Sequence, residues 1–267
     1  MSLDSKWNIL KEKLLELGSV LVAFSGGKDS TLLLKAAHEA LGDKCIAVTA
    51  QASIFSKRET IAAQSIAAGM GARHELVPLD VFGIEKFVRN DKDRCYFCKK
   101  HIFQAFKEKA AEYNLSWVVE GSNRDDVMDY RPGIRALQEL GILSPLREAG
   151  LTNREIRLLS KKMDLPTWDK PSNACLASRF PYGERITLNK LKQVEEAEDL
   201  LKSLGFEQCR TRCHQSIARI EVPKKDFEKI MDPPTREMIT EGFRSLGFTF
   251  VALDMDGFSS GSLNKLL

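Results

Sequence analysis

Six consecutive residues, Ser25-Gly26-Gly27-Lys28-Asp29-Ser30, combine two glycines, two hydroxyls and a carboxylate within one short turn. The apolar run Val20–Phe24 before them predicts a buried strand, and the residues after them read as a helix. Glycines let backbone N–H groups converge on an oxyanion, and a helix N-terminus adds partial positive charge. The serines are hydrogen-bond donors to phosphate oxygens, and Asp29 is an oxygen ligand of the kind that Mg²⁺ prefers. The turn therefore predicts a site for a nucleotide phosphate and magnesium.

The common ATP-binding loop has four residues between its first glycine and its Gly-Lys pair, and this turn does not fit that spacing. It resembles instead the PP-loop, SGGxDS, of ATP pyrophosphatases, with Lys28 at the variable position. The resemblance implies cleavage of ATP between its α- and β-phosphates. Such enzymes adenylate an oxygen and release pyrophosphate, which prepares a carbon for attack by nitrogen or sulfur.

Composition narrows the class of protein and its partners. The chain has 267 residues, 43% of them hydrophobic, and a net charge of +3 that is too small to indicate a nucleic-acid partner. No apolar stretch reaches 18 residues, and the N-terminus lacks the apolar region of a signal peptide, so we expect no membrane association and a cytoplasmic location. Thiols stay reduced there, and the six cysteines are more plausible as ligands, nucleophiles or core residues than as disulfides.

Apolar strands alternate with amphipathic helices in the first half of the chain, which predicts an α/β fold. The expected strands begin at Val20, Cys45, His74 and Trp117, and helices are expected over 30–41, 57–70 and 96–113. This order predicts a parallel sheet with helices on both faces, and ligands in such folds bind at the carboxyl ends of the strands.

The pattern changes beyond a polar, proline-containing linker. We predict a PP-loop ATP-binding domain over 1–165, a linker over 166–187 that carries Cys175, and a small α+β substrate-binding domain over 188–267. Within the last of these, helices are expected over 188–204 and 236–246 and strands over 208–214, 217–222 and 248–254.

Cys95 and Cys98 form a CxxC motif at the predicted start of a helix, with Asp93 as a candidate N-cap. The helix dipole and nearby cations, Lys99 among them, favour thiolates there, and Lys99 joins Asp29 and Cys175 as a candidate catalytic residue. CxxC by itself is compatible with zinc, a redox pair, a cluster ligand or no special role.

Cys175 in the linker is the candidate third ligand. Three cysteines suit a [4Fe–4S] cluster with one iron free of protein ligation. The alternative is a CxxC pair near a helix start with Cys175 acting alone.

Arg210 and Arg212 share one face of a predicted strand and make a fork for phosphate or carboxylate. The ordinary alternative is a solvated basic face. Because Arg179 lies close to Cys175 in the sequence, we favour an anionic substrate.

The fourth predicted strand runs into a segment rich in carboxylates, EGSNRDDVMDYRPG, over 120–133. Glu120, Asp125 and Asp126 are candidates for a second magnesium site or for positioning pyrophosphate. A helix N-terminus decorated with acids would explain Asp125 and Asp126 but not the whole segment.

Three motifs, SGGKDS, EGSNRDDVMDYRPG and CLASRFPYG, occur in an order that resembles the LarE family of PP-loop ATP-dependent sulfur transferases. The resemblance covers nearly the whole chain and implies synthesis of the nickel-pincer nucleotide cofactor from pyridinium-3,5-biscarboxylic acid mononucleotide. It also implies roles for individual residues: ATP and magnesium at Ser25, Gly26, Gly27, Lys28, Asp29 and Ser30, sulfur chemistry at Cys175, and substrate binding at Arg179, Glu198, Arg210 and Arg212.

Some members of the family surrender the sulfur of the linker cysteine and keep dehydroalanine, whereas others add a CxxC pair and use a [4Fe–4S] cluster. Cys95 and Cys98 place this chain with the second type. Expected partners are a sulfide or persulfide donor, other maturation proteins of the nickel-pincer cofactor, and further copies of this chain in a homo-oligomer.

Other classes of function remain open from sequence. A tRNA thiolation enzyme also pairs a PP-loop with cysteines, but it should carry an RNA-binding module or an extended basic surface. An ammonia-using amidotransferase-type ligase would not need three cysteines near its site. A non-catalytic nucleotide sensor would release no pyrophosphate.

Overall fold

The structure is a computed structural model that describes residues 1–128, 132–171 and 173–259. The chain divides into two compact units. The first contains Met1–Ile84 and Asp93–Asn173, and the second contains Glu85–Lys92 and Ala174–Leu267. No helix in the described ranges is both long enough and apolar enough to cross a membrane.

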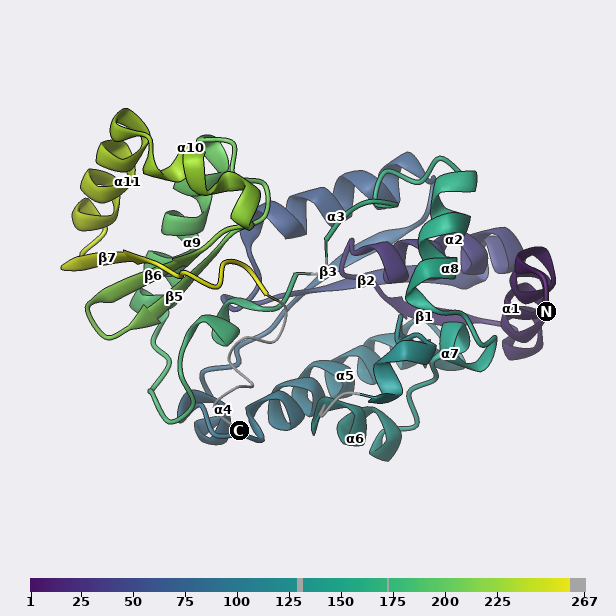
Figure 1. Ribbon diagram of the computed structural model, residues 1–267. Coiled ribbons are helices and arrows are strands. Elements are labelled where there is room, and N and C mark those ends of the chain that lie inside the picture. The colour runs from purple at the N-terminus through teal and green to yellow at the C-terminus, as the bar shows by residue number, and fades with distance from the viewer. Residues whose placement is uncertain (129–131, 172, 260–267) are drawn as a thin grey trace. The chain divides into compact units, whose positions relative to one another are not determined.

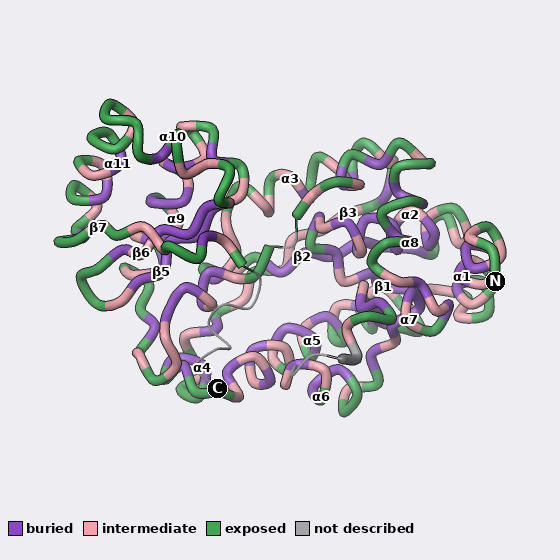
Figure 2. The backbone as a smooth tube through the Cα atoms, viewed as in Figure 1, coloured by how far each residue is buried: buried purple, intermediate pink, exposed green. Residues whose placement is uncertain are grey.

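The first unit is built on a sheet whose spatial order is β3-β2-β1-β4, with every neighbouring pair parallel (Figure 1). Its strands are β1 (Val20–Ala23), β2 (Cys45–Gln51), β3 (His74–Pro78) and β4 (Trp117–Val119). All four begin at the predicted residues, and the predicted α/β class is confirmed. Val20, Leu21 and Val22 of β1 are inaccessible to solvent, as expected of a central parallel strand covered on both faces (Figure 2).

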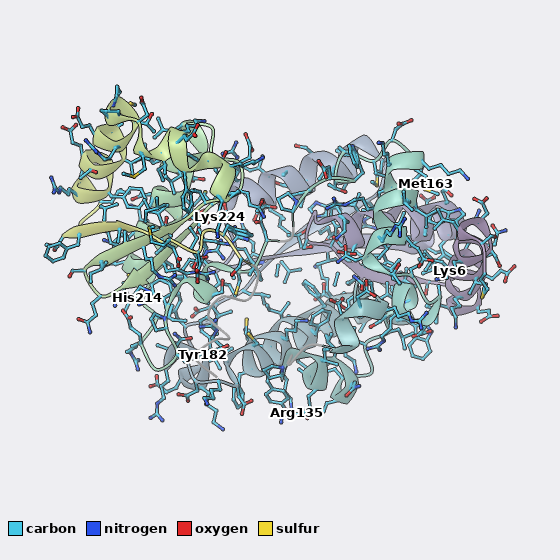
Figure 3. All side chains as sticks on the ribbon, in the orientation of Figure 1. Lys6, Arg135, Met163, Tyr182, His214 and Lys224 are labelled. Atoms are coloured by element: carbon cyan, nitrogen blue, oxygen red, sulfur yellow. The ribbon has the colours of Figure 1, made fainter. Side chains whose placement is uncertain are left out.

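Helices cover this sheet on both faces, and α2 and α5 each contact β1. The helices of the first unit are α1 (Leu3–Leu17), α2 (Lys28–Leu41), α3 (Lys57–Gly69), α5 (Arg94–Glu112), α6 (Pro132–Glu139), α7 (Pro145–Glu148) and α8 (Asn153–Lys162). Lys6 of α1, labelled in Figure 3, donates to both carboxylate oxygens of Glu155 on α8, at 2.7 and 2.8 Å. Although burial opposes ionisation of Glu155, hydrogen bonds from Lys6 and Thr152 lower its pKa to about 2. This ion pair ties the first helix of the unit to its last.

One residue extends the sheet beyond β4. Leu143 forms an isolated parallel bridge with Val119, and its carbonyl accepts from the backbone N–H of Glu120 at 2.9 Å. The sequence contains no strand pattern at Leu143, because a single bridge has no periodicity to detect.

The second unit contains a mixed three-stranded sheet of order β5-β6-β7, in which β5 and β6 are antiparallel and β6 and β7 are parallel. Its strands are β5 (Arg210–His214), β6 (Ile217–Glu221) and β7 (Phe250–Leu253), and its helices are α4 (Glu85–Val88), α9 (Leu188–Ser203), α10 (Phe227–Met231) and α11 (Pro233–Ser245). Gly205 and Gly247 follow α9 and α11 with φ of 81° and 97°, the left-handed conformation that favours glycine after a helix.

The second unit also includes the short segment Glu85–Lys92, which lies within the predicted ATP-binding domain in sequence. Backbone N–H groups of Gly183 and Ile186 donate to the carbonyls of Asn90 and Val88 at 3.0 and 2.9 Å. The Asn90 side-chain amide donates to the carbonyl of Pro181 at 2.6 Å. Because these bonds join residues about a hundred positions apart, no local sequence pattern indicates that this segment belongs to the second unit.

Candidate functional site

The predicted phosphate loop connects β1 to α2 as expected. Phe24 continues the sheet through a backbone bond to the carbonyl of Val48 at 2.8 Å, and α2 starts at Lys28. Gly26 has a φ of 65°, and a Cβ added to it would lie 3.0 Å from Ala63 on α3. A side chain at Gly26 would therefore be strained in conformation and would also clash with a packed helix.

The two serines of the loop face each other. Their hydroxyl oxygens are 3.1 Å apart, and the Ser30 hydroxyl is also 3.1 Å from the carbonyl of Gly27. The backbone N–H of Ser25 donates to Ser30 Oγ at 3.3 Å. These bonds hold the turn closed and gather hydroxyl groups at the N-terminus of α2, where an anion is stabilised by the helix dipole.

Asp29, in the first turn of α2, links this loop to the second predicted motif. The side-chain amide of Asn123 donates to Asp29 Oδ1 at 3.2 Å, and the Lys28 ammonium lies 3.4 Å from Oδ2. Burial raises the pKa of Asp29, against the opposing attraction of Lys28. A divalent cation would relieve this cost, because it favours the ionised carboxylate. Asn123 is not among the predicted site residues, although it lies within the motif EGSNRDD.

The motif has a glycine at position 121 because the backbone there passes too close to α2 for a side chain. A Cβ at Gly121 would lie 3.0 Å from the backbone nitrogen of Ser30. Since β1 and β4 are neighbours in the sheet, the segment after β4 passes directly against the first turn of α2.

Glu120, Asp125 and Asp126, the other described carboxylates of the motif, have their own hydrogen-bond donors. Glu120 is 7% exposed and accepts from the hydroxyls of Ser122 and Ser144 at 2.8 and 2.5 Å. Asp125 accepts from the backbone N–H of Asn153, and Asp126 from that of Asn123.

Across the described ranges 1–128, 132–171 and 173–259, no three His, Cys, Asp or Glu side chains gather as a metal site. Magnesium ligation by Glu120, Asp125 and Asp126 therefore stays a prediction. Asp129 and its neighbours through Arg131 lie outside the described residues.

Cys95 and Cys98 occupy the start of α5, as predicted. Cys98 is 8% exposed, Cys95 is half-buried, and neither forms a disulfide. Asp93 occupies the predicted N-cap position of α5, although its side chain makes no capping hydrogen bond. The Lys99 stem lies close to Gly133 of α6, where an added Cβ would be 2.6 Å from Lys99 Cδ.

Cys175 lies in the second unit, immediately before the short 3₁₀ helix η3 (Leu176–Arg179). Its thiol is half-buried, and its carbonyl accepts from the hydroxyl of Ser178 at 2.8 Å and from Arg179 Nη1 at 3.0 Å. The backbone at Cys175 is therefore held by groups of its own motif. Its grouping with Cys95 and Cys98 stays a prediction.

The predicted substrate arginines form buried ion pairs within the second unit. Arg179 donates two parallel bonds to Glu198, at 2.8 and 2.9 Å, with 2% and 3% of the two residues exposed. Although burial opposes charge on both groups, their mutual attraction lowers the pKa of Glu198 and raises that of Arg179. Glu198 also accepts from the backbone N–H of Thr211 at 3.0 Å, which joins α9 to β5.

Arg212 makes a second bidentate pair, with Glu221 on β6, at 3.0 and 2.8 Å. Its third nitrogen donates to the carbonyl of Ser178 at 2.7 Å. The solvated basic face considered above is thus excluded, because Arg210 and Arg212 are 7% and 5% exposed. Glu221 was not predicted, and only the cross-strand register between β5 and β6 reveals it.

Arg210 differs from the other two arginines in its electrostatic surroundings. It donates to the carbonyl of Cys209 at 2.8 Å, and its guanidinium lies 5.1 Å from the centre of the Phe258 ring. Burial, followed by repulsion from Arg179, lowers the pKa of Arg210 to about 10. An anion beside Arg210 would be strongly attracted.

We predict that Asp29→Asn leaves the melting temperature of the ligand-free protein at pH 7 unchanged or raises it, by on the order of 2 °C. A carboxyl whose folded pKa is raised contributes stability that is lost as pH rises through that pKa, and the amide avoids this loss. The difference from wild type should shrink as pH falls and Asp29 becomes protonated. Thermal unfolding between pH 4 and 8 measures it, with the exposed Asp43→Asn as control, and a clearly lower melting temperature at pH 7 would refute it.

The chain is similar to known proteins over its whole length. No family model matches it. It is 40% identical over 265 residues to an uncharacterized protein of Synechocystis sp., which covers 99% of each chain. It is 38% identical over 270 residues to pyridinium-3,5-bisthiocarboxylic acid mononucleotide synthase of Lactiplantibacillus plantarum, which covers 100% of this chain and 96% of that one.

A weaker similarity to another enzyme covers only part of the chain. The chain is 25% identical over 159 residues to one subunit of the glutamine-hydrolyzing GMP synthase of Archaeoglobus fulgidus, which covers 56% of this chain and 52% of that one. The match to the GMP synthase subunit is partial, whereas the match to the mononucleotide synthase spans the full length of this chain and includes its phosphate loop. The chain therefore belongs to the LarE family of PP-loop ATP-dependent sulfur transferases.

Proposed function

We propose that this protein adenylates a carboxylate of pyridinium-3,5-biscarboxylic acid mononucleotide and then converts it to a thiocarboxylate. The observation that carries the proposal is the full-length similarity to the synthase whose product is the bisthiocarboxylic acid mononucleotide. In the first step a carboxylate oxygen attacks the α-phosphorus of ATP and pyrophosphate leaves. In the second, sulfide attacks the acyl carbon and AMP leaves.

The loop over 25–30 would bind the ATP phosphates. Its backbone N–H groups, the hydroxyls of Ser25 and Ser30 and the N-terminus of α2 supply donors and positive potential. Asp29 fits as a magnesium ligand because its raised pKa reflects a buried carboxylate that a cation would stabilise. Bound magnesium would neutralise charge on the phosphates.

The arginines of the second unit would bind the anionic substrate. The ion pairs of Arg179 with Glu198 and of Arg212 with Glu221 hold two guanidinium groups rigidly, and Arg210 adds a charge in an electropositive environment. Rigid donors bind a phosphate without losing further side-chain entropy, which favours affinity.

Cys95 and Cys98 fit two ligands of an iron–sulfur cluster. Their sulfur atoms belong to residues three positions apart at a helix start, which is a suitable donor set, and Cys175 would supply the third thiolate. When bound, a [4Fe–4S] cluster would supply an exchangeable position for sulfide. Lys99, next to Cys98 in the sequence, would place a positive charge near the incoming anion.

The same proposal specifies partners. It requires a sulfide or persulfide donor and the other maturation proteins of the nickel-pincer cofactor, and we place the enzyme in the cytoplasm as a homo-oligomer.

We expect ATP to be converted to AMP and pyrophosphate only when the dicarboxylic nucleotide is present. Asp29→Asn should slow this reaction on the order of a hundredfold, because it removes the carboxylate that would hold magnesium. Chromatography of the nucleotides together with a pyrophosphate assay makes the measurement, and Asp43→Asn is the control. ADP as the product would overturn the assignment, and an amide product formed from ammonia would indicate a ligase instead.

Arg210→Met should weaken binding of the nucleotide substrate by about 2–5 kcal/mol while leaving ATP affinity unchanged, because a buried guanidinium contact to an anion is lost. Arg210 suits this test better than Arg212, whose removal would leave Glu221 buried without its bidentate partner. Titration calorimetry with each ligand separates the two affinities, and the exposed Arg236→Met is the control. Weakened ATP binding with intact substrate binding would show that the substrate site is elsewhere.

Alanine at Cys95, Cys98 or Cys175 should lose most of the bound iron and the multiple-turnover activity together, because three thiolates hold one cluster. Cys45→Ala, at a buried cysteine of β2, should keep both. Iron analysis and the visible spectrum of protein prepared without oxygen make the measurement.

The sacrificial mechanism gives the opposite result for these variants. Cys95→Ala and Cys98→Ala would then retain a single turnover, and mass spectrometry would find dehydroalanine at residue 175 of the wild-type protein. Dehydroalanine in iron-replete protein after reaction would defeat the cluster mechanism.

A further inference from the structure

Lys170 reaches the phosphate loop from a distant part of the chain. Its ammonium donates to the carbonyl of Gly26 at 3.0 Å and to Glu59 Oε2 at 2.6 Å. Glu59 lies in the first turn of α3, and its other oxygen accepts from the side-chain amide of Asn173 at 2.8 Å. All four residues belong to the first unit, so Glu59 anchors both ends of a stretch that begins at Lys170.

Lys170 binds the carbonyl of Gly26, and the orientation of this carbonyl affects which way the loop directs its N–H groups. Gly26 adopts a left-handed backbone conformation and is pressed against Ala63 of α3. Because the carbonyl of Gly26 and the N–H of Gly27 belong to one planar peptide group, a bond that fixes the carbonyl also fixes the N–H direction. In this structure the N–H of Gly27 donates to Ser25 Oγ at the long distance of 3.4 Å, and a phosphate oxygen bound at the loop would compete for it.

We infer that Lys170 is a positioning residue for ATP and that Glu59 orients it. Lys170 holds the Gly26–Gly27 peptide in the orientation that presents its N–H to the phosphates, and it adds positive charge at the loop. Binding of ATP at the loop is thereby coupled to the conformational order of residues 166–171. That stretch precedes Cys175 in the chain, so nucleotide binding and the start of the sulfur-bearing segment are linked through one ammonium. The inference rests on ATP binding at the loop and not on the identity of the acceptor.

The test uses the full-length protein and the non-cleavable α,β-methylene analogue of ATP with magnesium. Lys170→Met keeps the aliphatic stem and removes the charge, and we expect the analogue to bind about ten- to a hundredfold more weakly. Lys170→Arg, which keeps a cation, should recover most of the affinity. The control is Lys35→Met, which removes a lysine from α2 whose ion pair with Glu39 spans 3.1 Å and should leave affinity unchanged.

A double-mutant cycle tests whether Glu59 acts through Lys170. Glu59→Gln should weaken binding of the analogue when it is introduced into the wild-type protein. It should have little further effect on binding when it is added to Lys170→Met, because both changes disturb one contact. Hydrogen exchange adds a readout of coupling. The analogue should slow exchange in residues 25–30 and 166–171 of wild type, but only in 25–30 of Lys170→Met.

Three results would overturn the inference: analogue affinity of Lys170→Met within twofold of wild type, additive effects of the two substitutions, or unchanged protection of 166–171 in Lys170→Met. None of these measurements includes a carboxylate acceptor, sulfide or iron. A failure of the proposed sulfur transfer would therefore leave this result intact, and the reverse also holds.

Discussion

The pairing of β1 with β4 is the constraint on which the first unit's site depends. Val22 lies opposite Val119 in a parallel register, so both strands deliver their following residues to the same edge of the sheet. The close approach of Gly121 to the Ser30 backbone and the hydrogen bond from Asn123 to Asp29 follow directly. A slip of one residue in this register would displace Gly121 and Asn123 relative to α2 and break the hydrogen bond from Asn123 to Asp29. The register is therefore held by polar as well as apolar groups.

The second unit differs in that it buries several guanidinium groups in a small domain. Removing a charge from water is costly unless it is paired and hydrogen-bonded. Arg179 and Arg212 meet this requirement through bidentate contacts with carboxylates that are themselves buried. The carboxylates thereby compensate the charge of both guanidinium groups inside the unit. The same arginines donate to the backbone carbonyls of Ala174, Cys175 and Ser178, which fixes the cysteine segment relative to α9 and β5.

The proposed function divides two kinds of chemistry between the two compact units of the chain. The parallel sheet supplies a rigid strand-to-helix turn for phosphate, as strands of this class do at their carboxyl ends. The second unit contains the buried arginines and, just before η3, Cys175. The full-length similarity to a synthase of a sulfur-containing nucleotide fits this division, whereas the similarity to the GMP synthase covers only 56% of the chain.

The sequence by itself determined the class of fold, the positions of all four parallel strands and the phosphate loop. Apolar runs that end in glycine and polar residues are local signals that can be recognised along the chain. Only the tertiary structure decided which groups meet. Glu221 as the partner of Arg212, Lys170 on Gly26, the Leu143 bridge and the placement of 85–92 in the second unit all join residues that are distant in the chain. Period and composition describe what lies along a strand, but they do not report which strand becomes its neighbour. A buried ion pair exists only once that neighbour is in place, so the arginines could be identified from sequence while their partners and their burial could not.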